Sequence, residues 1–144
     1  MQGSNTTFIY IHAIWCTAGK QPVLTPIVRK VLFAYMKKSA EESGIQVIVV
    51  NGGDEHVHCL FKLMPTQSVS AIISQLQSGS GSWLNNNKLL PGPFQWNEAY
   101  SAWSVSPSTV DKAAEYISRQ EAYHLEKTLD EELAAFDRMV VHVN

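Results

Sequence analysis

The chain has 144 residues, of which 45% are hydrophobic and 17% are charged, and its formal net charge is −2. These values are typical of one globular domain, and no apolar run approaches the roughly 20 residues that a membrane-spanning helix needs. The first residues show no secretion-signal pattern, so we expect a single domain over residues 1–144, in the cytoplasm and without a membrane partner.

Charge is unevenly distributed along the chain. Six of the 13 acidic residues but only two of the 11 basic ones follow residue 120, so a weakly basic body precedes an acidic tail. The negative total argues mildly against nucleic acid as a partner, because phosphate contacts usually need a basic surface. Cys16 and Cys59 are far apart and form no CxxC pair, so we expect reduced thiols that bind no metal.

The first half of the chain predicts a strand, a helix and a hairpin. Residues 7–16 are rich in β-branched and aromatic types and predict a strand that is buried on both faces. Apolar residues recur at helical spacing over residues 26–43, after a Thr-Pro start. Residues 45–51 and 56–64 predict two strands, and the Gly-Gly-Asp-Glu stretch between them predicts a hairpin turn.

The second half of the chain predicts three helices and a fourth strand. The first of these helices is capped by Thr66 or Ser68 and is expected to weaken at the Ser-Gly-Ser-Gly-Ser run of residues 78–82. The remaining elements are a short strand over residues 100–106, a helix over residues 107–124 and an acidic helix over residues 128–140.

The order of these elements is β α β β α β α α. Two hairpin strands flanked by βα and αβ units indicate the α+β class, with a ferredoxin-like antiparallel sheet and helices on one side of it. We expect the core domain to span about residues 7–126, with the acidic helix appended to it.

Two histidines stand one residue apart at the start of the third strand. Strand alternation places His56 and His58 on one face, away from the apolar face that contains Cys59. Two neutral imidazoles at this spacing can share one divalent ion. Two ligands alone do not make a metal site, so a structural role for the pair stays open.

The helix over residues 107–124 offers a third ligand and a hydroxyl. Tyr116 and Gln120 stand at positions i and i+4, so they lie one turn apart on a flank of the apolar face. The carboxamide oxygen of Gln120 could complete a metal shell close to the Tyr116 hydroxyl. In an arbitrary helix the same pair would be a boundary aromatic and an exposed amide.

Taken together, these motifs resemble the single-tyrosine HUH transposases of bacterial insertion sequences and their REP-associated relatives. The resemblance rests on the His-Val-His triplet of residues 56–58, the "YSAWSVS" of residues 100–106 and the "YISRQ" of residues 116–120. It extends from about Ile9 to Phe136. The His-x-His pair alone is a weak signal, but its combination with Tyr-x-x-x-Gln in this order of elements is fairly specific.

The resemblance implies a nuclease and strand transferase that acts on single-stranded DNA. In that family the tyrosine, here Tyr116, attacks a phosphodiester and becomes linked to the 5′ phosphate, leaving a free 3′ hydroxyl. A divalent ion, Mg or Mn, would be held by His56, His58 and Gln120 and would polarise the scissile phosphate. Imidazole ligands favour Mn over Mg.

The resemblance also implies a homodimer and DNA hairpins as partners. For DNA binding we expect Lys20, Arg29 and Lys30 to contact phosphates and Tyr100 to stack on bases. Further candidates are Lys37, Lys88, Trp96 and Trp103. The chain departs from the family in having Glu55 where an aspartate often precedes the histidine pair, and in lacking a lysine between residues 74 and 82.

Three alternatives of other classes stay open. The chain could be a domesticated protein that binds DNA hairpins without transposition activity, a metal-dependent phosphoesterase that uses the histidines alone, or a purely structural ferredoxin-like module. A metal-free two-histidine phosphoesterase is excluded, because it would need a second His-x-Ser/Thr motif and the sequence has none.

Overall fold

The computed structural model describes residues 5–120 and 127–140. Four strands form one antiparallel sheet in the order β2-β3-β1-β4. The elements are β1 (Tyr10–Thr17), η1 (Ala18–Lys20), α1 (Pro26–Glu42), β2 (Gln46–Gly52), β3 (His56–Lys62), α2 (Val69–Asn86), β4 (Trp96–Val105), η2 (Pro107–Thr109), α3 (Val110–Ser118) and α5 (Leu129–Met139). The expected α+β antiparallel sheet and its hairpin are confirmed.

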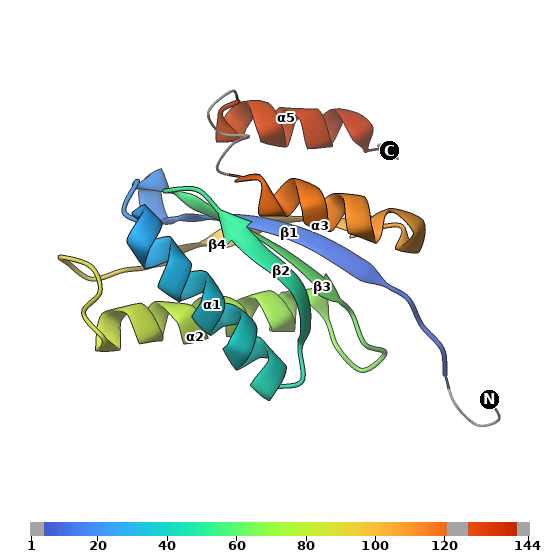
Figure 1. The fold of residues 1–144 in the computed structure, drawn as a ribbon, viewed down its shortest axis with the longest axis horizontal. Helices are drawn as coiled ribbons and strands as arrows, with labels where there is room; N and C mark the ends of the chain where they lie inside the picture. The colour runs from blue at the N-terminus through green and yellow to red at the C-terminus, as the bar shows by residue number, and fades with distance from the viewer. Residues whose placement is uncertain (1–4, 121–126, 141–144) are drawn as a thin grey trace.

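Helices cover both faces of this sheet (Figure 1). Helices α1 and α2 lie on one face, as expected, whereas α3 and α5 lie on the other. The expectation of helices on one side is therefore corrected for the C-terminal third of the chain. The physical reason lies in β3, where every residue from His56 to Phe61 is buried, so that both faces of this central strand need cover.

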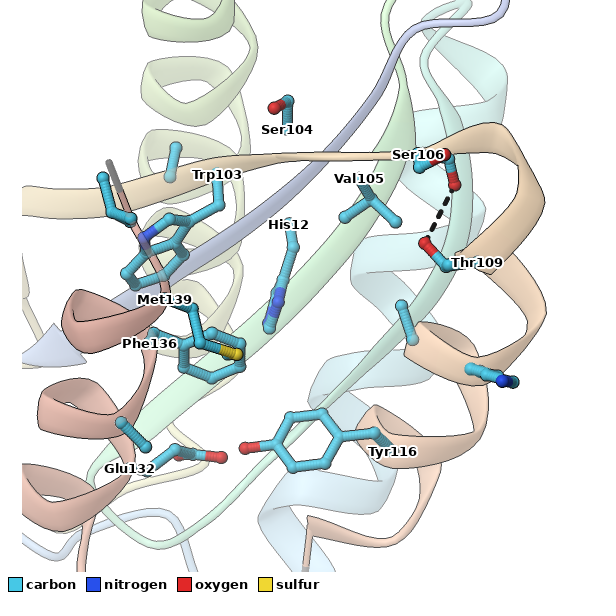
Figure 2. Close-up of a pocket in the computed structure, with 15 residues that line it drawn as sticks. His12, Trp103, Ser104, Val105, Ser106, Thr109, Tyr116, Glu132, Phe136 and Met139 are labelled. Carbon is cyan, nitrogen blue, oxygen red and sulfur yellow. Dashed lines mark hydrogen bonds between the residues drawn. The ribbon is translucent and has the colours of Figure 1, made fainter. Parts of the chain in front are cut away.

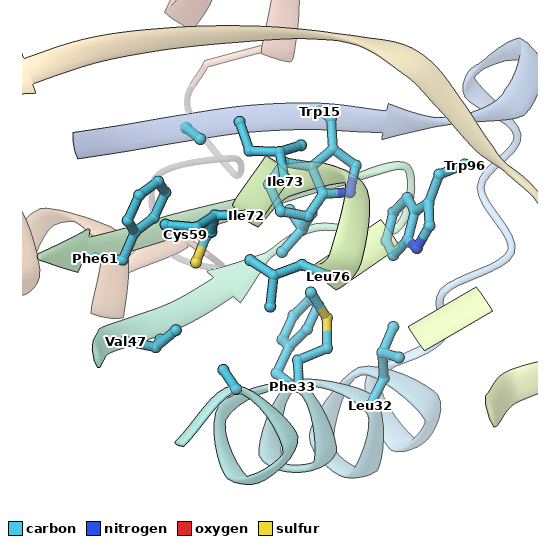
Figure 3. Close-up of a cluster of buried hydrophobic side chains, with 14 of the residues drawn as sticks. Trp15, Leu32, Phe33, Val47, Cys59, Phe61, Ile72, Ile73, Leu76 and Trp96 are labelled. Atoms are coloured by element: carbon cyan, nitrogen blue, oxygen red, sulfur yellow. The ribbon is translucent and has the colours of Figure 1, made fainter. Parts of the chain in front are cut away.

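The hydrophobic core fills the space between the sheet and helices α1 and α2 (Figure 3). Strand β1 contributes Trp15, and strand β3 contributes Cys59 and Phe61, each 1% exposed or less. Leu32 and Phe33 of α1 pack against them, together with Ile72, Ile73 and Leu76 of α2. Burial raises the pKa of the Cys59 thiol to about 12, and both cysteines are free thiols, as expected.

Helix α2 continues through the Ser-Gly-Ser-Gly-Ser run at which we expected it to weaken. The hydroxyl of Ser80 donates to the carbonyl oxygen of Leu76 at 2.6 Å and accepts a hydrogen bond from the Trp96 indole at 2.9 Å. Gly81 lies beside the same indole, where a Cβ would be in ordinary van der Waals contact at 3.9 Å. Packing against Trp96 therefore outweighs the low helix propensity of these residues.

Boundaries in the second half differ from the expected ones by a few residues. Strand β4 begins at Trp96, before the expected residue 100, and α3 begins at Val110 after a 3₁₀ turn at Pro107–Thr109. The helix expected over residues 107–124 ends at Ser118, where Arg119 caps it, and the expected residues 121–124 lie outside the described ones. Helix α5 confirms the acidic helix and begins at a capping box between Thr128 and Glu131. Within the described ranges, no helix is both long and apolar enough to cross a membrane.

Candidate active site

The two histidines of β3 face α3 and α5, on the side of the sheet opposite the hydrophobic core. This agrees with the alternation expected from the sequence. Both imidazoles are nevertheless 0% exposed, so they lie in a second buried layer and not on a half-solvated face. A buried polar ring must have hydrogen-bond partners, and the partners of these two rings define the site.

His56 is held by its own hairpin turn. Its Nδ1 lies 2.5 Å from a carboxylate oxygen of Glu55, the residue that stands where the resembling family often has aspartate. The turn closes tightly on this ring: a side chain at Gly52 would collide with the main-chain oxygen of His56, and one at Gly53 would collide with the imidazole. With Nδ1 directed at the Glu55 carboxylate, which can accept its hydrogen bond, the Nε2 of His56 faces the interior of the site.

His58 has a second histidine as its partner. Its Nδ1 lies 2.7 Å from the Nε2 of His12, and the two rings stack with their centroids 5.0 Å apart. His12 comes from β1 and is only 3% exposed. Burial lowers the pKa of His12 from 6.5 to about 4, so this imidazole is neutral at physiological pH.

The Nε2 atoms of the two histidines converge on Gln120 and Glu132. The Nε2 of His56 lies 3.2 Å from the carboxamide oxygen of Gln120, and the Nε2 of His58 lies 3.1 Å from Oε1 of Glu132. The Gln120 amide also donates to Oε2 of Glu132 at 2.8 Å. Both partners are 0% exposed, so four polar side chains meet in one buried cluster: two from β3, Gln120 from two residues after α3, and Glu132 from α5.

This cluster fits a divalent cation. Ligand atoms of His56, His58 and Glu132 all lie within 4.8 Å of one another. If Glu55 takes the Nδ1 proton of His56, then the ring's Nε2 lone pair faces the carbonyl oxygen of Gln120, and a cation would relieve this contact between two acceptors. Two imidazoles with carboxylate and amide oxygens suit ions such as Mn²⁺ better than Mg²⁺.

Glu132 is the only acid among these four residues, and it is an unusual one. Burial, and next the charge of Glu55, raise its pKa from 4.5 to about 8. Without a cation the carboxyl is therefore mostly protonated at neutral pH, and it can donate to the Nε2 of His58. A bound cation would favour the ionised form of the same carboxyl.

Tyr116 lies beside this cluster within the same chain. Its ring centroid is 6.0 Å from that of His58 and 5.8 Å from that of Phe136. Figure 2 shows the Tyr116 hydroxyl pointing toward the carboxylate of Glu132. The amide of Asn51 in β2 donates to the carbonyl oxygen of Ile117 at 2.9 Å, which fixes the end of α3 on the sheet.

A cavity of about 920 Å³ opens next to Tyr116, between β4, α3 and α5. Trp103 and Phe136 stack on each other along one side of it, with centroids 4.9 Å apart (Figure 2). Lys112 also lines this cavity. The space therefore combines aromatic faces and a cation beside the side chain of Tyr116, whose hydroxyl is itself buried.

The expected DNA-binding residues do not form one patch. Lys20 pairs with Asp130 of α5 at 3.1 Å, and Arg29 donates to the carbonyl oxygen of Leu24 at 2.7 Å. The amide of Leu24 in turn donates to the carbonyl oxygen of Asp54, so these two cations lie at the end of the sheet where β3 begins. Lys30 is exposed on α1.

The aromatic candidates on β4 lie on opposite faces of the sheet. Tyr100 is 40% exposed and pairs with Trp15, so it lies on the side of α2, where it lines a second, polar cavity of about 580 Å³. Trp103 pairs with His12 and lies on the side of Tyr116. Trp96 is only 5% exposed and belongs to the core, so stacking on bases is excluded for it in this fold.

Sequence reasoning did not anticipate two residues of this site, His12 and Glu132. A signal for each was present. His12 lies inside a strand of otherwise apolar and aromatic residues, and Glu132 lies on the apolar stripe of α5 between Leu129 and Phe136. A single ionisable residue on a buried stripe indicates a partner across the interface.

Comparisons with known proteins show the family of this chain. The family model described as "Transposase IS200 like" matches residues 5–120. The chain is 27% identical over 114 residues to the ISDra2 transposase TnpA of Deinococcus radiodurans, covering 76% of this chain and 81% of that protein.

Two solved structures share the fold. One is a candidate transposase from Deinococcus radiodurans R1, with a TM-score of 0.65, 22% identity, and coverage of 83% of this chain and 97% of that one. The other is a REP-associated tyrosine transposase bound to a REP hairpin, with a TM-score of 0.60, 11% identity, and coverage of 86% and 74%. With the family model spanning most of its length, this chain belongs to the IS200-like transposase family.

Proposed function

We propose that this chain cleaves and rejoins single-stranded DNA at hairpin-bearing ends through a covalent 5′-phosphotyrosine at Tyr116. Membership of the family makes it a transposase, and the proposal concerns how it works. One observation supports it above all: within one chain, Tyr116 lies beside a buried cluster of His56, His58, Gln120 and Glu132. A structural module has no need of this combination.

The proposed reaction uses the phenol oxygen of Tyr116 as the nucleophile. That oxygen forms a bond to phosphorus while the bond from phosphorus to the 3′ oxygen breaks. The leaving 3′ oxygen takes a proton from water, which leaves a 5′-phosphotyrosine and a free 3′ hydroxyl. The phenol proton can pass to the ionised carboxylate of Glu132, toward which the hydroxyl points (Figure 2). Since the phosphodiester energy is kept in the covalent link, the same steps run backwards for rejoining.

A divalent cation would be held by His56, His58 and Glu132, with the carboxamide oxygen of Gln120 as a further ligand. When bound, such an ion polarises the scissile phosphate and stabilises the charge that develops on it. The expected set of two histidines and one glutamine is thus extended by Glu132, and we prefer Mn²⁺ over Mg²⁺ on the chemistry of the ligands.

Hairpin DNA as a substrate is supported by the fold neighbour that is bound to a REP hairpin. The cavity beside Tyr116 offers room for the strand to be cut, with Trp103 and Phe136 as faces for an unpaired base. The proposed phosphate contacts are Lys20 and Arg29, at the end of the sheet where β3 begins, and Lys30 on α1. The proposed stacking contact is Tyr100, in the polar cavity along α2.

A homodimer is part of the proposal, and the edge of the sheet is the place for it. Strand β4 is an outer strand of the described sheet and is exposed over most of its ten residues. A long exposed edge strand is a template for pairing with a second chain. Sedimentation velocity of the purified protein, with and without hairpin DNA, measures this directly, and a monomer under both conditions would remove the dimer from the proposal.

Lys30→Ala is expected to weaken hairpin binding by about threefold and to reduce the slope of log affinity against log salt by about 1, because one phosphate contact is lost. Fluorescence anisotropy at several salt concentrations measures both quantities. Lys38→Ala is the matched control, since Lys38 is an equally exposed lysine of α1 that we do not assign to DNA. Equal effects of the two substitutions would argue against a defined contact at Lys30.

The experiment that tests the proposed reaction is a search for the covalent adduct. The purified protein is incubated with a pool of labelled single-stranded hairpin DNAs and Mn²⁺ or Mg²⁺, and the products are separated on denaturing gels. We expect a protease-sensitive adduct that forms only with the metal. The pool should include the hairpins that flank the gene. If the protein then binds metal but cleaves none of these DNAs, the result would favour a hairpin-binding protein without transposition activity.

A further inference from the structure

His12 and His58 form a pair that strand pairing brings together. Strand β1 runs antiparallel to β3, with His12 opposite Leu60 and Ile14 opposite His58, so the two imidazoles are diagonal neighbours on one face. The Nε2 of His12 and the Nδ1 of His58 are 2.7 Å apart, and the rings are inclined by only 27°. At this distance one proton lies between the two nitrogens, and one ring donates it to the other.

The other nitrogen of His58 decides which ring donates. The Nε2 of His58 faces Oε1 of Glu132 at 3.1 Å, inside the cluster proposed to bind the cation. To present a lone pair there, His58 must carry its proton on Nδ1, so His12 must accept at Nε2. The lone pair that the cation needs at Nε2 therefore fixes the direction of the hydrogen bond between the two rings.

We propose that His12 is a positioning residue for His58: it accepts the Nδ1 proton and so fixes the tautomer and ring orientation that direct Nε2 at the cation. This inference rests on the proposed metal site. His12 does for His58 what Glu55 does for His56, whose Nδ1 lies 2.5 Å from the Glu55 carboxylate.

The surroundings of His12 explain why a neutral acceptor occupies this position. The ring of Phe136 stands edge-on at 5.2 Å and that of Trp103 at 6.0 Å, so His12 lies beneath an aromatic cover. A carboxylate here would be buried without a cationic partner among these contacts, at a high desolvation cost. A neutral imidazole accepts the same hydrogen bond and also packs against the aromatic rings.

Two substitutions separate positioning from packing. His12→Phe keeps a flat ring beside His58 but removes the acceptor. His12→Gln restores an acceptor, because the amide oxygen of glutamine can reach about the position of Nε2. We expect His12→Phe to weaken Mn²⁺ binding by about 10- to 100-fold in calorimetric titrations, and His12→Gln to recover most of the loss.

The tautomer of His58 can be read with the diamagnetic cation Zn²⁺ bound. In ¹⁵N-edited NMR spectra of the imidazoles, we expect His58 to carry its proton on Nδ1 in the wild type and in His12→Gln, and to lose this preference in His12→Phe. A wild-type His58 protonated on Nε2 would overturn the inference even if no variant folded. The inference would also be overturned if wild type and His12→Phe bound Mn²⁺ with equal affinity. It would be overturned likewise if His12→Phe and His12→Gln lost the same amount of Mn²⁺ affinity.

The same measurements distinguish this inference from the proposed function. Wild-type protein that binds no Mn²⁺ would refute the metal site, and with it the role of His12. Wild-type protein that binds Mn²⁺ as tightly as His12→Phe does would refute the role of His12 alone. Melting temperatures of the metal-free variants measure any loss of packing. A loss of packing alone would not change the tautomer of His58, and glutamine would not reverse it.

Discussion

Tyr116→Phe is expected to lower the yield of covalent protein–DNA adduct by at least about 10³-fold, while hairpin affinity stays within about twofold of the wild type. The substitution removes only the phenol oxygen, which is the proposed nucleophile, and keeps the ring that packs against His58 and Phe136. Denaturing gels measure the adduct, and anisotropy with the same hairpin measures binding.

The matched control is Tyr35→Phe. Tyr35 stacks on Trp83 with centroids 4.4 Å apart, in the α1 and α2 layer on the far side of the sheet, so the loss of its hydroxyl should leave the adduct unchanged. An adduct that persists in Tyr116→Phe at the wild-type level would show that another group is the nucleophile. A parallel fall in both variants would point to a general loss of folded protein.

The buried state of the histidines changes what a substitution of His58 can show. A ring on a half-solvated face could be removed at little cost in stability. In the structure, however, His58 is 0% exposed and bonds to both His12 and Glu132. Its removal leaves a cavity and two buried polar groups without this partner, a change that usually costs a few kcal/mol. A fall in melting temperature is therefore expected for His58→Ala whether or not the ring binds a metal.

Local patterns were sufficient to predict the elements and the shared face of the histidine pair. The alternation in β3 places His56 and His58 on one face, because this rule depends only on backbone geometry. The expected i, i+4 stacking of Tyr116 and Gln120 was not obtained from one helix, because α3 ends at Ser118 and Gln120 follows a turn at Arg119. The course of α2 through its glycines did not follow from propensity. It depends on the contact between Ser80 and Trp96, two residues that only the tertiary fold brings together.

The rest of the site depends on how distant elements pack. Acids at the start of a helix suit the positive end of the helix dipole, and Glu131 in the capping box fits this rule. The next residue, Glu132, points the other way, onto the sheet. Which face of α5 is buried, and that it covers His58, depends on how α5 packs against the sheet, which no local pattern specifies. The pairing of His12 with His58 likewise needs the register of β1 against β3.

Glu132→Gln is expected to weaken Mn²⁺ binding by about 100-fold and to remove a pH dependence of stability. Glutamine has nearly the same shape and can keep neutral hydrogen bonds to His58 and Gln120, so the fold is retained. It cannot supply an anionic oxygen to a cation. Calorimetric titration measures the affinity, and thermal unfolding without metal from pH 5 to pH 9 measures the stability.

The sign of the pH effect follows from the direction of the pKa shift. The pKa of Glu132 rises from 4.5 to about 8 on folding, because burial disfavours the ionised form. The stability linked to this group is therefore fully present below pH 4.5 and is lost as the pH rises through 8. Without metal, the wild type should lose on the order of a few kcal/mol relative to Glu132→Gln across this range.

Glu131→Gln is the matched control on the same helix. Glu131 is exposed, and glutamine can serve equally in a capping box, so this substitution removes one charge from α5 without changing the site. His12 and the other ionisable groups titrate in the wild type and in both variants. Their contribution therefore cancels when the stabilities of the three proteins are compared. If the wild type and Glu132→Gln show the same change of stability from pH 5 to pH 9, the raised pKa of Glu132 is contradicted.

Mn²⁺ should reverse the effect of pH in the wild type, because a bound cation favours the carboxylate that burial disfavours. The rise in melting temperature on adding Mn²⁺ is therefore expected to grow between pH 6 and pH 8 in the wild type and in Glu131→Gln, and to grow much less in Glu132→Gln. If all three proteins gain equally from Mn²⁺ at every pH, the cation does not bind to Glu132, and the site contains only the two histidines and Gln120.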